Sequence, residues 1–333
     1  MLIRQEPEGL YCEAGGFYID PTRGVERALI THAHADHARR GSRHYLCAEP
    51  CRALLETRLG KKQSIETLAY GETCLINGVH VSFHPAGHVL GSSQIRVSHR
   101  DEVWVISGDY KLHPDPTCAR FEPVACHHFV SECTFGSPIY QWPSPESQWS
   151  RLRQWWQRHQ QLGVNSLVLG YSLGKAQRIL HACHGMEGPI LVHTSIHDCI
   201  PAYQAQGIHF PPYQILSTAT LRAHDGKVLV IAPPSARVEH NLATPEHWEI
   251  MGVSGWLMTR TQRRKKGQCH GLIVSDHADW PGLLEAINAS QAHTILLMHG
   301  DSRMLEQVLG SEGRQVMRME RSTRKIEPSS EGS

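Results

Sequence analysis

Hydrophobic residues in the first 135 positions occur as short runs separated by glycine, proline and aspartate. The runs are rich in β-branched and aliphatic side chains and lie at residues 28–30, 79–83, 94–97, 103–106 and 128–130. Runs of this kind, bounded by turn-forming residues, are typical of β-strands. One helix is predicted from Cys51 to Leu59, since Pro50 precedes it and Gly60 follows it. The first part of the chain is therefore predicted to be mostly β.

The pattern changes after residues 143–145, which read Pro-Ser-Pro. Trp149, Leu152 and Trp156 recur at helical spacing and predict an amphipathic helix from Glu146 to about Gln161. Predicted strands then alternate with helical segments, which indicates a mostly parallel sheet. The predicted strands are 166–169, 190–193, 227–231 and 272–274, with a helix at 175–182; a helix (281–289), a strand (294–298) and a helix (302–309) follow.

The length of 333 residues exceeds what one hydrophobic core usually organises, so we expect one large domain with an insertion, or two domains. The chain is 40% hydrophobic and 20% charged, as in ordinary globular proteins, and no apolar run approaches the roughly 18 residues of a membrane span. The net charge of +1 argues against a uniformly basic nucleic-acid coat but permits a local basic patch.

The expected location is the cytoplasm, without a membrane partner. Glu6 and Pro7 interrupt the beginning of the chain, where a signal peptide needs a continuous apolar stretch. The ten cysteines form no CxxC pair and no disulfide spacing, so reduced thiols are expected.

Histidine is unusually frequent, with 24 residues, and imidazole is the commonest metal ligand. Residues 31–37 read THAHADH directly after the apolar run 28–30. His32 and His34 share one face of an extended segment, whereas Asp36 and His37 follow where the chain can turn. This geometry suits two metal ions side by side. The alternative interpretation is a solvated, histidine-rich loop.

Two further candidate ligands lie at predicted strand ends. His88 stands in a glycine-bounded turn (PAGHVLGS), and Asp109 follows the run 103–106 in the sequence SGD. Each alone is more typical of a satisfied loop histidine or a turn-capping aspartate. Behind HxHxDH, in this order, they indicate further metal ligands.

This combination resembles the metallo-β-lactamase superfamily, and Asp20 in YIDP is similar to its early outer-shell aspartate. Residues 131–136 (SECTFG), 275–279 (SDHAD) and 297–301 (LMHGD) resemble three motifs of the superfamily's β-CASP nuclease branch. GYSLGKAQ at 170–177, with the APPSA and SDHADW stretches, is most similar to the bacterial exonuclease group associated with a DNA ligase.

The resemblance implies an α/β fold, a metallo-β-lactamase αββα sandwich with an inserted β-CASP α/β domain. Residues 1–137 and 276–333 would form the metallo-β-lactamase domain, and residues 138–275 the inserted domain.

The resemblance also implies a metal centre that hydrolyses phosphodiester bonds with a water activated by two metals. The implied ligands are His32, His34 and His88 for one metal, Asp36, His37 and His299 for the other, and Asp109 as the bridge. Nitrogen and oxygen ligands suit two divalent ions, Zn²⁺ or Mn²⁺.

The remaining catalytic candidates are Glu132 and His277, beside the bridging Asp109 and the outer-shell Asp20. Glu132 is expected to accept a hydrogen bond from a ligand histidine or the bridging water. His277 is expected to donate a proton to the leaving oxygen or to bind the scissile phosphate. The alternative for His277 is a structural turn histidine.

Nucleic acid is favoured as the substrate by five cations in residues 260–266, although a charge run can also be a solvated loop. The candidate substrate-binding residues are Ser172, Lys175, Arg263, Arg264, Lys265 and Lys266. Trp142, Trp149, Trp155 and Trp156 can stack on bases but are more typical of a core.

The resemblance favours a DNA exonuclease that acts on single-stranded ends in repair, in functional association with a DNA ligase and a helicase. An RNA-processing enzyme stays as the alternative, because His299 also fits RNA-cleaving β-CASP enzymes. A small-molecule metallohydrolase should lack the insertion and the cationic run, and a noncatalytic scaffold should have lost ligands.

Overall fold

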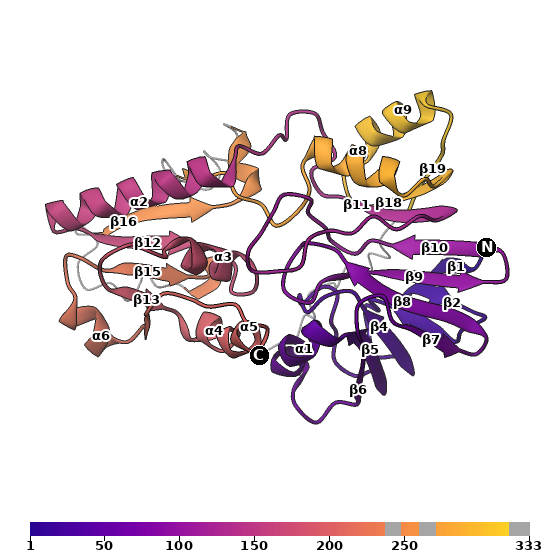
Figure 1. The fold of residues 1–333 in the computed structure, drawn as a ribbon, viewed down its shortest axis with the longest axis horizontal. Helices are drawn as coiled ribbons and strands as arrows, with labels where there is room; N and C mark the ends of the chain where they lie inside the picture. Colours follow the sequence, from indigo (N-terminus) through magenta and orange to yellow (C-terminus); the bar gives the residue numbers. More distant parts are fainter. Residues whose placement is uncertain (237–247, 260–270, 320–333) are drawn as a thin grey trace, which may run out of the picture.

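The structure is a computed structural model that describes residues 1–236, 248–259 and 271–319. The described elements form three sheets. Two of them face each other at one end of the molecule, and the third lies at the other end (Figure 1). The predicted α/β class is confirmed.

The first sheet holds the amino-terminal strands in chain order. They are β1 (Ile3–Glu6), β2 (Gly9–Cys12), β3 (Phe17–Ile19), β4 (Arg27–Ile30), β5 (His44–Ala48) and β6 (Ile65–Leu68). Strands β3 to β6 are parallel neighbours. A short 3₁₀ turn, η1 (Glu49–Cys51), and α1 (Arg52–Leu59) connect β5 to β6.

The second sheet combines the middle and the end of the chain in the order β19-β18-β11-β10-β9-β8-β7. Its strands are β7 (Thr73–Ile76), β8 (Val79–Pro85), β9 (Ser93–His99), β10 (Glu102–Ile106), β11 (His128–Cys133), β18 (Thr294–Gly300) and β19 (Gln315–Arg318). Helices α8 (Trp280–Ala289) and α9 (Arg303–Ser311) cover its outer face (Figure 1).

Two hydrophobic clusters hold these layers together. Leu29 of β4 and Trp104 of β10 belong to one cluster that fills the space between the two sheets. Phe129 of β11 packs in a second cluster with Leu283 of α8 and Leu305 of α9. Leu54 of α1 packs with Tyr45 of β5 on the other side of the first sheet, so helices cover both sheets in the predicted αββα order of layers.

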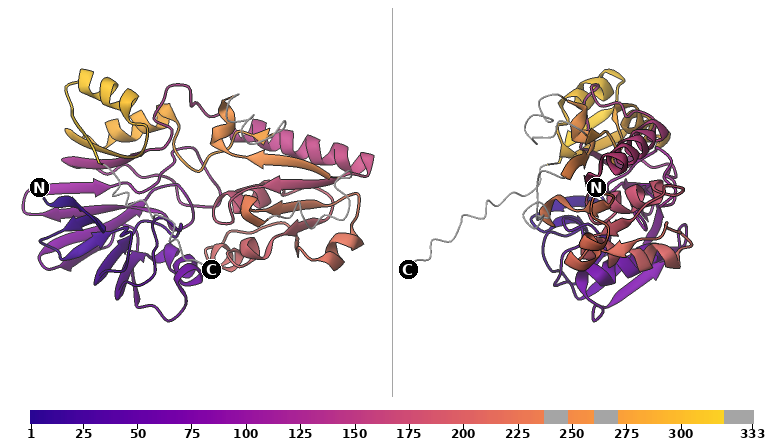
Figure 2. Two further views of the ribbon diagram at one scale, coloured as in Figure 1. Left: turned by 180° about the vertical axis from the view of Figure 1, so that it is seen from behind. Right: turned by 90° about the vertical axis from the view of Figure 1, so that its left-hand side faces the viewer.

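The third sheet is entirely parallel, in the order β14-β13-β15-β12-β16-β17. Its strands are β12 (Asn165–Leu169), β13 (Ile190–Val192), β14 (Gln214–Ile215), β15 (Leu229–Ala232), β16 (Trp248–Val253) and β17 (Gly271–Leu272). Its helices are α2 (Pro145–Leu162), α3 (Lys175–Ala182), α4 (Thr194–His197), α5 (Ile200–Ala205) and α6 (Thr218–Ala223), with 3₁₀ turns η2 (Pro234–Ala236) and η5 (Gly255–Met258). Views from behind and from the side show these helices around the sheet (Figure 2).

Local signals place the ends of α2. The side chain of Ser144 caps its beginning by accepting a hydrogen bond from the Ser147 amide, and Gly163 ends it with a left-handed φ of 68°. Among the described helices, none is long and apolar enough to cross a membrane. The domain bounds at residues 138 and 275 stay a prediction, and all six strands of the third sheet fall between them.

Candidate metal centre

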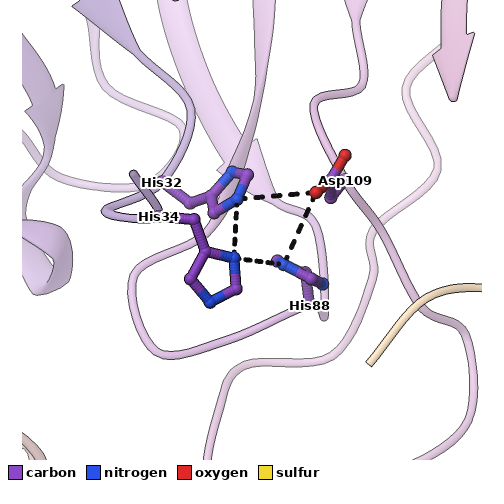
Figure 3. Close-up of side chains that lie close together, drawn as sticks. All are labelled: His32, His34, His88 and Asp109. Carbon is purple, nitrogen blue, oxygen red and sulfur yellow. Dashed lines mark hydrogen bonds and ion pairs between the residues drawn. The ribbon is translucent and has the colours of Figure 1, made fainter. Parts of the chain in front are cut away.

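Four predicted ligands meet at the carboxyl ends of three strands. His32 and His34 follow β4, His88 follows β8 and Asp109 follows β10. His34 Nδ1 lies 3.1 Å from His32 Nε2 and 3.0 Å from His88 Nε2. Asp109 Oδ2 lies 3.6 Å from His32 Nε2 and 3.7 Å from His88 Nε2. The four contacts form a closed ring of side chains (Figure 3).

Hydrogen bonds outside this ring decide which nitrogen of each histidine faces inward. His88 Nδ1 donates to the carbonyl of Asp276 at 2.6 Å, and His34 Nε2 donates to the carbonyl of Leu173 at 3.2 Å. In a neutral imidazole the second nitrogen then carries a lone pair. His88 Nε2 and His34 Nδ1 therefore point lone pairs at each other across 3.0 Å.

Burial keeps these imidazoles neutral, because it lowers the pKa of His34 and lowers the pKa of His32 and His88 well below their usual values. Opposed lone pairs repel unless a cation lies between them. A tetrahedral ion with ligands at about 2.0–2.2 Å separates them by roughly 3.3–3.6 Å, close to the observed spacings. The four residues thus fit a divalent metal ion.

The second predicted set is more open. His37 Nε2 lies 3.5 Å from Asp109 Oδ2 and 3.7 Å from Asp36 Oδ2, and it is buried without a hydrogen-bond partner among the described residues. His299, at the end of β18, places its ring centroid 5.4 Å from that of His37. The orphaned nitrogen beside two carboxylates fits a second cation. Of the two predicted sets, the first forms a tight group with Asp109 in the described part of the chain, and a further group brings Asp109 together with Glu132 and His277.

Asp20 orients the second predicted set through hydrogen bonds to Thr31 and His37. One carboxylate oxygen accepts the Thr31 amide at 2.8 Å, and the other accepts the Thr31 hydroxyl at 2.5 Å and His37 Nδ1 at 2.7 Å. Burial lowers the pKa of His37, but the carboxylates of Asp109 and Asp20 outweigh it and raise that pKa well above its usual value. Asp20 therefore orients His37 so that Nε2 faces Asp109.

Glu132 holds His277 rather than a metal ligand. Its carboxylate accepts His277 Nδ1 at 2.8 and 3.0 Å and the Tyr110 amide at 2.8 Å. The histidine that Glu132 contacts is thus His277, which lies outside the predicted ligand set, while the expected contact of Glu132 with a bridging water stays a prediction. Burial lowers the pKa of His277, but Glu132 and Asp109 outweigh it and raise it to about 9. The His277 ring lies 4.8 Å from that of His88.

A buried network of charges joins α3 to the metal centre. Asp115 accepts from Lys111 Nζ at 2.6 Å and Arg178 Nε at 2.9 Å, and Arg178 Nη1 donates to Asp276 at 2.9 Å. Lys175, predicted to bind phosphate, is buried with its Nζ 3.1 Å from Asp276 Oδ2. Asp276 also supplies the carbonyl that orients His88, so this network reaches a metal ligand directly.

A cavity of about 1020 Å³ opens over the ligands. Its lining includes His34, Asp36, His88, Asp109, His277 and His299 from the centre, and Ser172, Lys175, Ser195, Ser254 and Trp256 from the loops and the first helical turns that follow the third sheet's strands. Ser172 Oγ lies 2.8 Å from Ser195 Oγ. The predicted contacts Arg263, Arg264, Lys265 and Lys266 lie outside the described residues.

The tryptophans separate into two groups. Trp149, Trp155 and Trp156 pack into the core between α2 and the third sheet, as their spacing predicts. Trp142 instead packs against Phe135, with ring centroids 4.7 Å apart. Trp256 lines the cavity but was missed, because it follows a strand that no local pattern predicted.

No family model matches the chain. The chain is 31% identical over 314 residues to a protein named "Probable DNA ligase" from Opitutus terrae, covering 92% of this chain and 30% of that protein. It is 30% identical over 162 residues to "Transcription termination factor FttA" from Thermococcus kodakarensis, covering 43% of this chain and 24% of that protein. The chain thus spans less than a third of the length of these two relatives.

A solved structure of a protein of unknown function from Enterococcus faecalis is also similar, with a TM-score of 0.59 and 13% identity over 89% of this chain and 79% of that chain. This likeness shows the fold alone. The relatives and the motifs indicate the class: the chain is similar to proteins of the metallo-β-lactamase superfamily and its β-CASP branch. Within that branch it is most like the bacterial group associated with DNA ligase.

Proposed function

We propose that the protein is a metal-dependent nuclease that hydrolyses phosphodiester bonds of DNA, acting as an exonuclease on single-stranded ends during repair. The observation that carries the proposal is the ring of inward-facing ligands beside the Glu132–His277 pair, at the base of a cavity large enough for a nucleic-acid strand.

Bound divalent ions supply Lewis-acid stabilisation of a phosphoryl group and favour ionisation of water at neutral pH. The protein's own groups supply orientation and a proton. Glu132 accepts His277 Nδ1–H, so His277 Nε2 is directed away from Glu132. From there it can donate a proton to the leaving oxygen or a hydrogen bond to the scissile phosphate.

The identity of the nucleic acid rests on the relatives. A match at 31% identity that covers 92% of this chain is to a protein named for DNA ligation, which favours DNA. The relative named as a transcription termination factor supports RNA as the alternative, although that match covers less than half of the chain. A small-molecule metallohydrolase is less favoured, because the third sheet and its loops add a second wall to the cavity.

We also propose a functional association with a DNA ligase. The Opitutus protein is more than three times the length that this chain matches, so an equivalent segment lies within a larger protein named for ligation. An association with a helicase rests on the family resemblance, and the cytoplasmic location stays a prediction.

The decisive experiment is digestion of end-labelled single- and double-stranded DNA and RNA by purified protein with added Zn²⁺ or Mn²⁺. We expect stepwise shortening of single-stranded DNA, abolished by EDTA and restored by one of the two metals. Preferential cleavage of RNA would favour the alternative, an RNA-processing nuclease, over the DNA exonuclease. If the protein cleaves neither DNA nor RNA, the proposed nuclease function is refuted.

A further inference from the structure

Four aromatic side chains form a cluster beside the metal centre. Phe135 is at its middle, with ring centroids 4.8 Å from Tyr140, 4.7 Å from Trp142 and 4.6 Å from Trp256. Phe135 also lies 6.1 Å from the ring of His277. Trp256 is therefore separated from the ligand His88 by only two rings, those of Phe135 and His277.

The local backbone holds Trp256 in this position. A Cβ on Gly255 would lie 2.8 Å from Trp142 Cη2, 2.9 Å from Phe135 Cζ and 3.0 Å from Ser275 Cβ, so only glycine allows this approach. The Ser254 side chain accepts the Trp256 amide at 3.3 Å and caps the 3₁₀ turn. Tyr140 supports the indole from another side, with its ring nearly perpendicular at 5.7 Å.

The cluster is buried on one side and open on the other. Phe135 is only 2% exposed, whereas Trp256 is half-buried and lines the cavity. A second aromatic side chain, Tyr171, lines the same cavity and is 62% exposed. Tyr171 follows β12 and Trp256 follows β16, and these two strands are parallel neighbours in the third sheet. Both aromatic residues therefore lie at the edge of the sheet that faces the metal centre.

We propose that Trp256 and Tyr171 are stacking positions for unpaired nucleobases, which makes single-stranded nucleic acid the substrate class of this site. The inference rests on the proposed nuclease function. Every base has a flat π-face, so an aromatic platform binds single strands with little regard to sequence. Bases of a duplex already stack on each other and must be unstacked before they reach such a platform.

The test measures KM and kcat for a single-stranded DNA oligonucleotide with wild type, Trp256→Leu, Trp256→Phe and Tyr171→Leu. We expect Trp256→Leu to raise KM roughly 5- to 150-fold, the range that stacking on one aromatic side chain contributes. Trp256→Phe should recover most of the loss, since it keeps a ring. Tyr171→Leu, at an exposed position where misfolding is not expected, should raise KM in the same direction.

Trp155→Leu is the matched control, because Trp155 lies on α2 and is not among the residues that line the cavity. A strand with phosphorothioate linkages and a terminal 2-aminopurine gives a spectroscopic readout of stacking. Its fluorescence should fall on binding to wild type and to Trp155→Leu, and should fall less with Trp256→Leu. A KM within twofold of wild type for both Trp256→Leu and Tyr171→Leu would overturn the inference.

An activated diester without a nucleobase, ethyl 4-nitrophenyl phosphate, separates this inference from the proposed function. Trp256→Leu should lose at least tenfold more efficiency on the oligonucleotide than on this diester. Equal losses on both substrates would overturn stacking while the nuclease stands. A wild-type protein that cleaves neither substrate would refute the nuclease, and the inference with it.

Discussion

The two walls of the cavity are built by different means. On the metal side, each inward-facing nitrogen is directed by a hydrogen bond that its own ring makes outside the centre, as with His34 and His88. On the opposite side, Ser172 and Trp256 stand on loops after parallel strands. Yet the acceptors for His34 and His88 are the carbonyls of Leu173 and Asp276, which belong to the second wall or its border. The wall that faces the substrate thus also orients the metal ligands.

This comparison separates two kinds of variant. Changes on the metal side should reduce turnover of every phosphodiester, large or small. Changes on the opposite wall should reduce only the use of a polymer, unless they disturb the carbonyls of Leu173 or Asp276.

The largest effect is expected for Asp109→Ala. Asp109 Oδ2 lies within 3.7 Å of His32, His37 and His88, so its loss removes the carboxylate shared by both ligand sets. Activity should fall further than the roughly 10- to 100-fold that changes around a metal site cost, and metal content should fall with it. Atomic absorption and diester hydrolysis check this, with Asp101→Ala in an exposed turn as the control. Two retained metals with normal turnover would exclude Asp109 as the bridge.

His277→Ala should be next, slowing turnover of both substrates roughly 10²-fold or more while metal content stays unchanged. The reason is that His277 lies beside the ligands but bonds to Glu132. Glu132→Gln keeps an acceptor for Nδ1 and should cost less than His277→Ala. Metal analysis of both variants is the measurement, and loss of a metal from His277→Ala would make His277 a ligand.

The sequence predicted the ligands because they stand close together or directly after apolar runs. It could not predict their orientation: the His34 to Leu173 bond spans 139 residues and the His88 to Asp276 bond spans 188. Lys175 was assigned to phosphate for a similar reason: its carboxylate partner, Asp276, is also far away in the sequence, so the ion pair between them could not be predicted. Strands β1 to β3 were missed because each is only three or four residues long, and β16 because its preceding sequence is polar.

The buried network of charges around Asp115 supplies a prediction about stability. The pKa of Asp115 is lowered to about 2, because Lys111 and Arg178 outweigh the opposite effect of burial. Removing one partner of such a buried pair costs about 3 kcal/mol or more, so Asp115→Asn should lower the free energy of unfolding by that amount at pH 7. Glu56→Gln, which breaks an exposed pair with Arg52 on α1, should cost less than about 1 kcal/mol.

The sign of the pH dependence follows from the lowered pKa. The contribution of Asp115 is fully present above its unfolded-state pKa of about 3.9 and is lost as the pH falls through about 2. The difference between wild type and Asp115→Asn should therefore shrink between pH 4 and pH 2 in urea titrations. A difference in unfolding free energy that stays constant over that range would show that the substitution does not act through the charge of Asp115.

The smallest effect on turnover is expected from the cationic run, whose residues 263–266 lie outside the described part of the chain. Replacing Arg263, Arg264, Lys265 and Lys266 together by glutamine should weaken binding of single-stranded DNA. It should also flatten the dependence on salt, because each lost phosphate contact removes about 0.7 from the log–log slope. Fluorescence anisotropy over a series of salt concentrations measures both quantities.

A control variant that removes two exposed lysines elsewhere tests whether the effect is specific to the cationic run. Lys61 and Lys62 are exposed after α1, so replacing them by glutamine changes net charge without touching the proposed phosphate contacts at residues 263–266. This control should leave the slope close to wild type, because counterions are released only where a cation meets a phosphate. If the run is only a solvated loop, both multiple variants will show the wild-type slope. Loss of diester cleavage together with binding would instead point to a disturbed fold near His277, and the assignment of the run to phosphate binding would then be withdrawn.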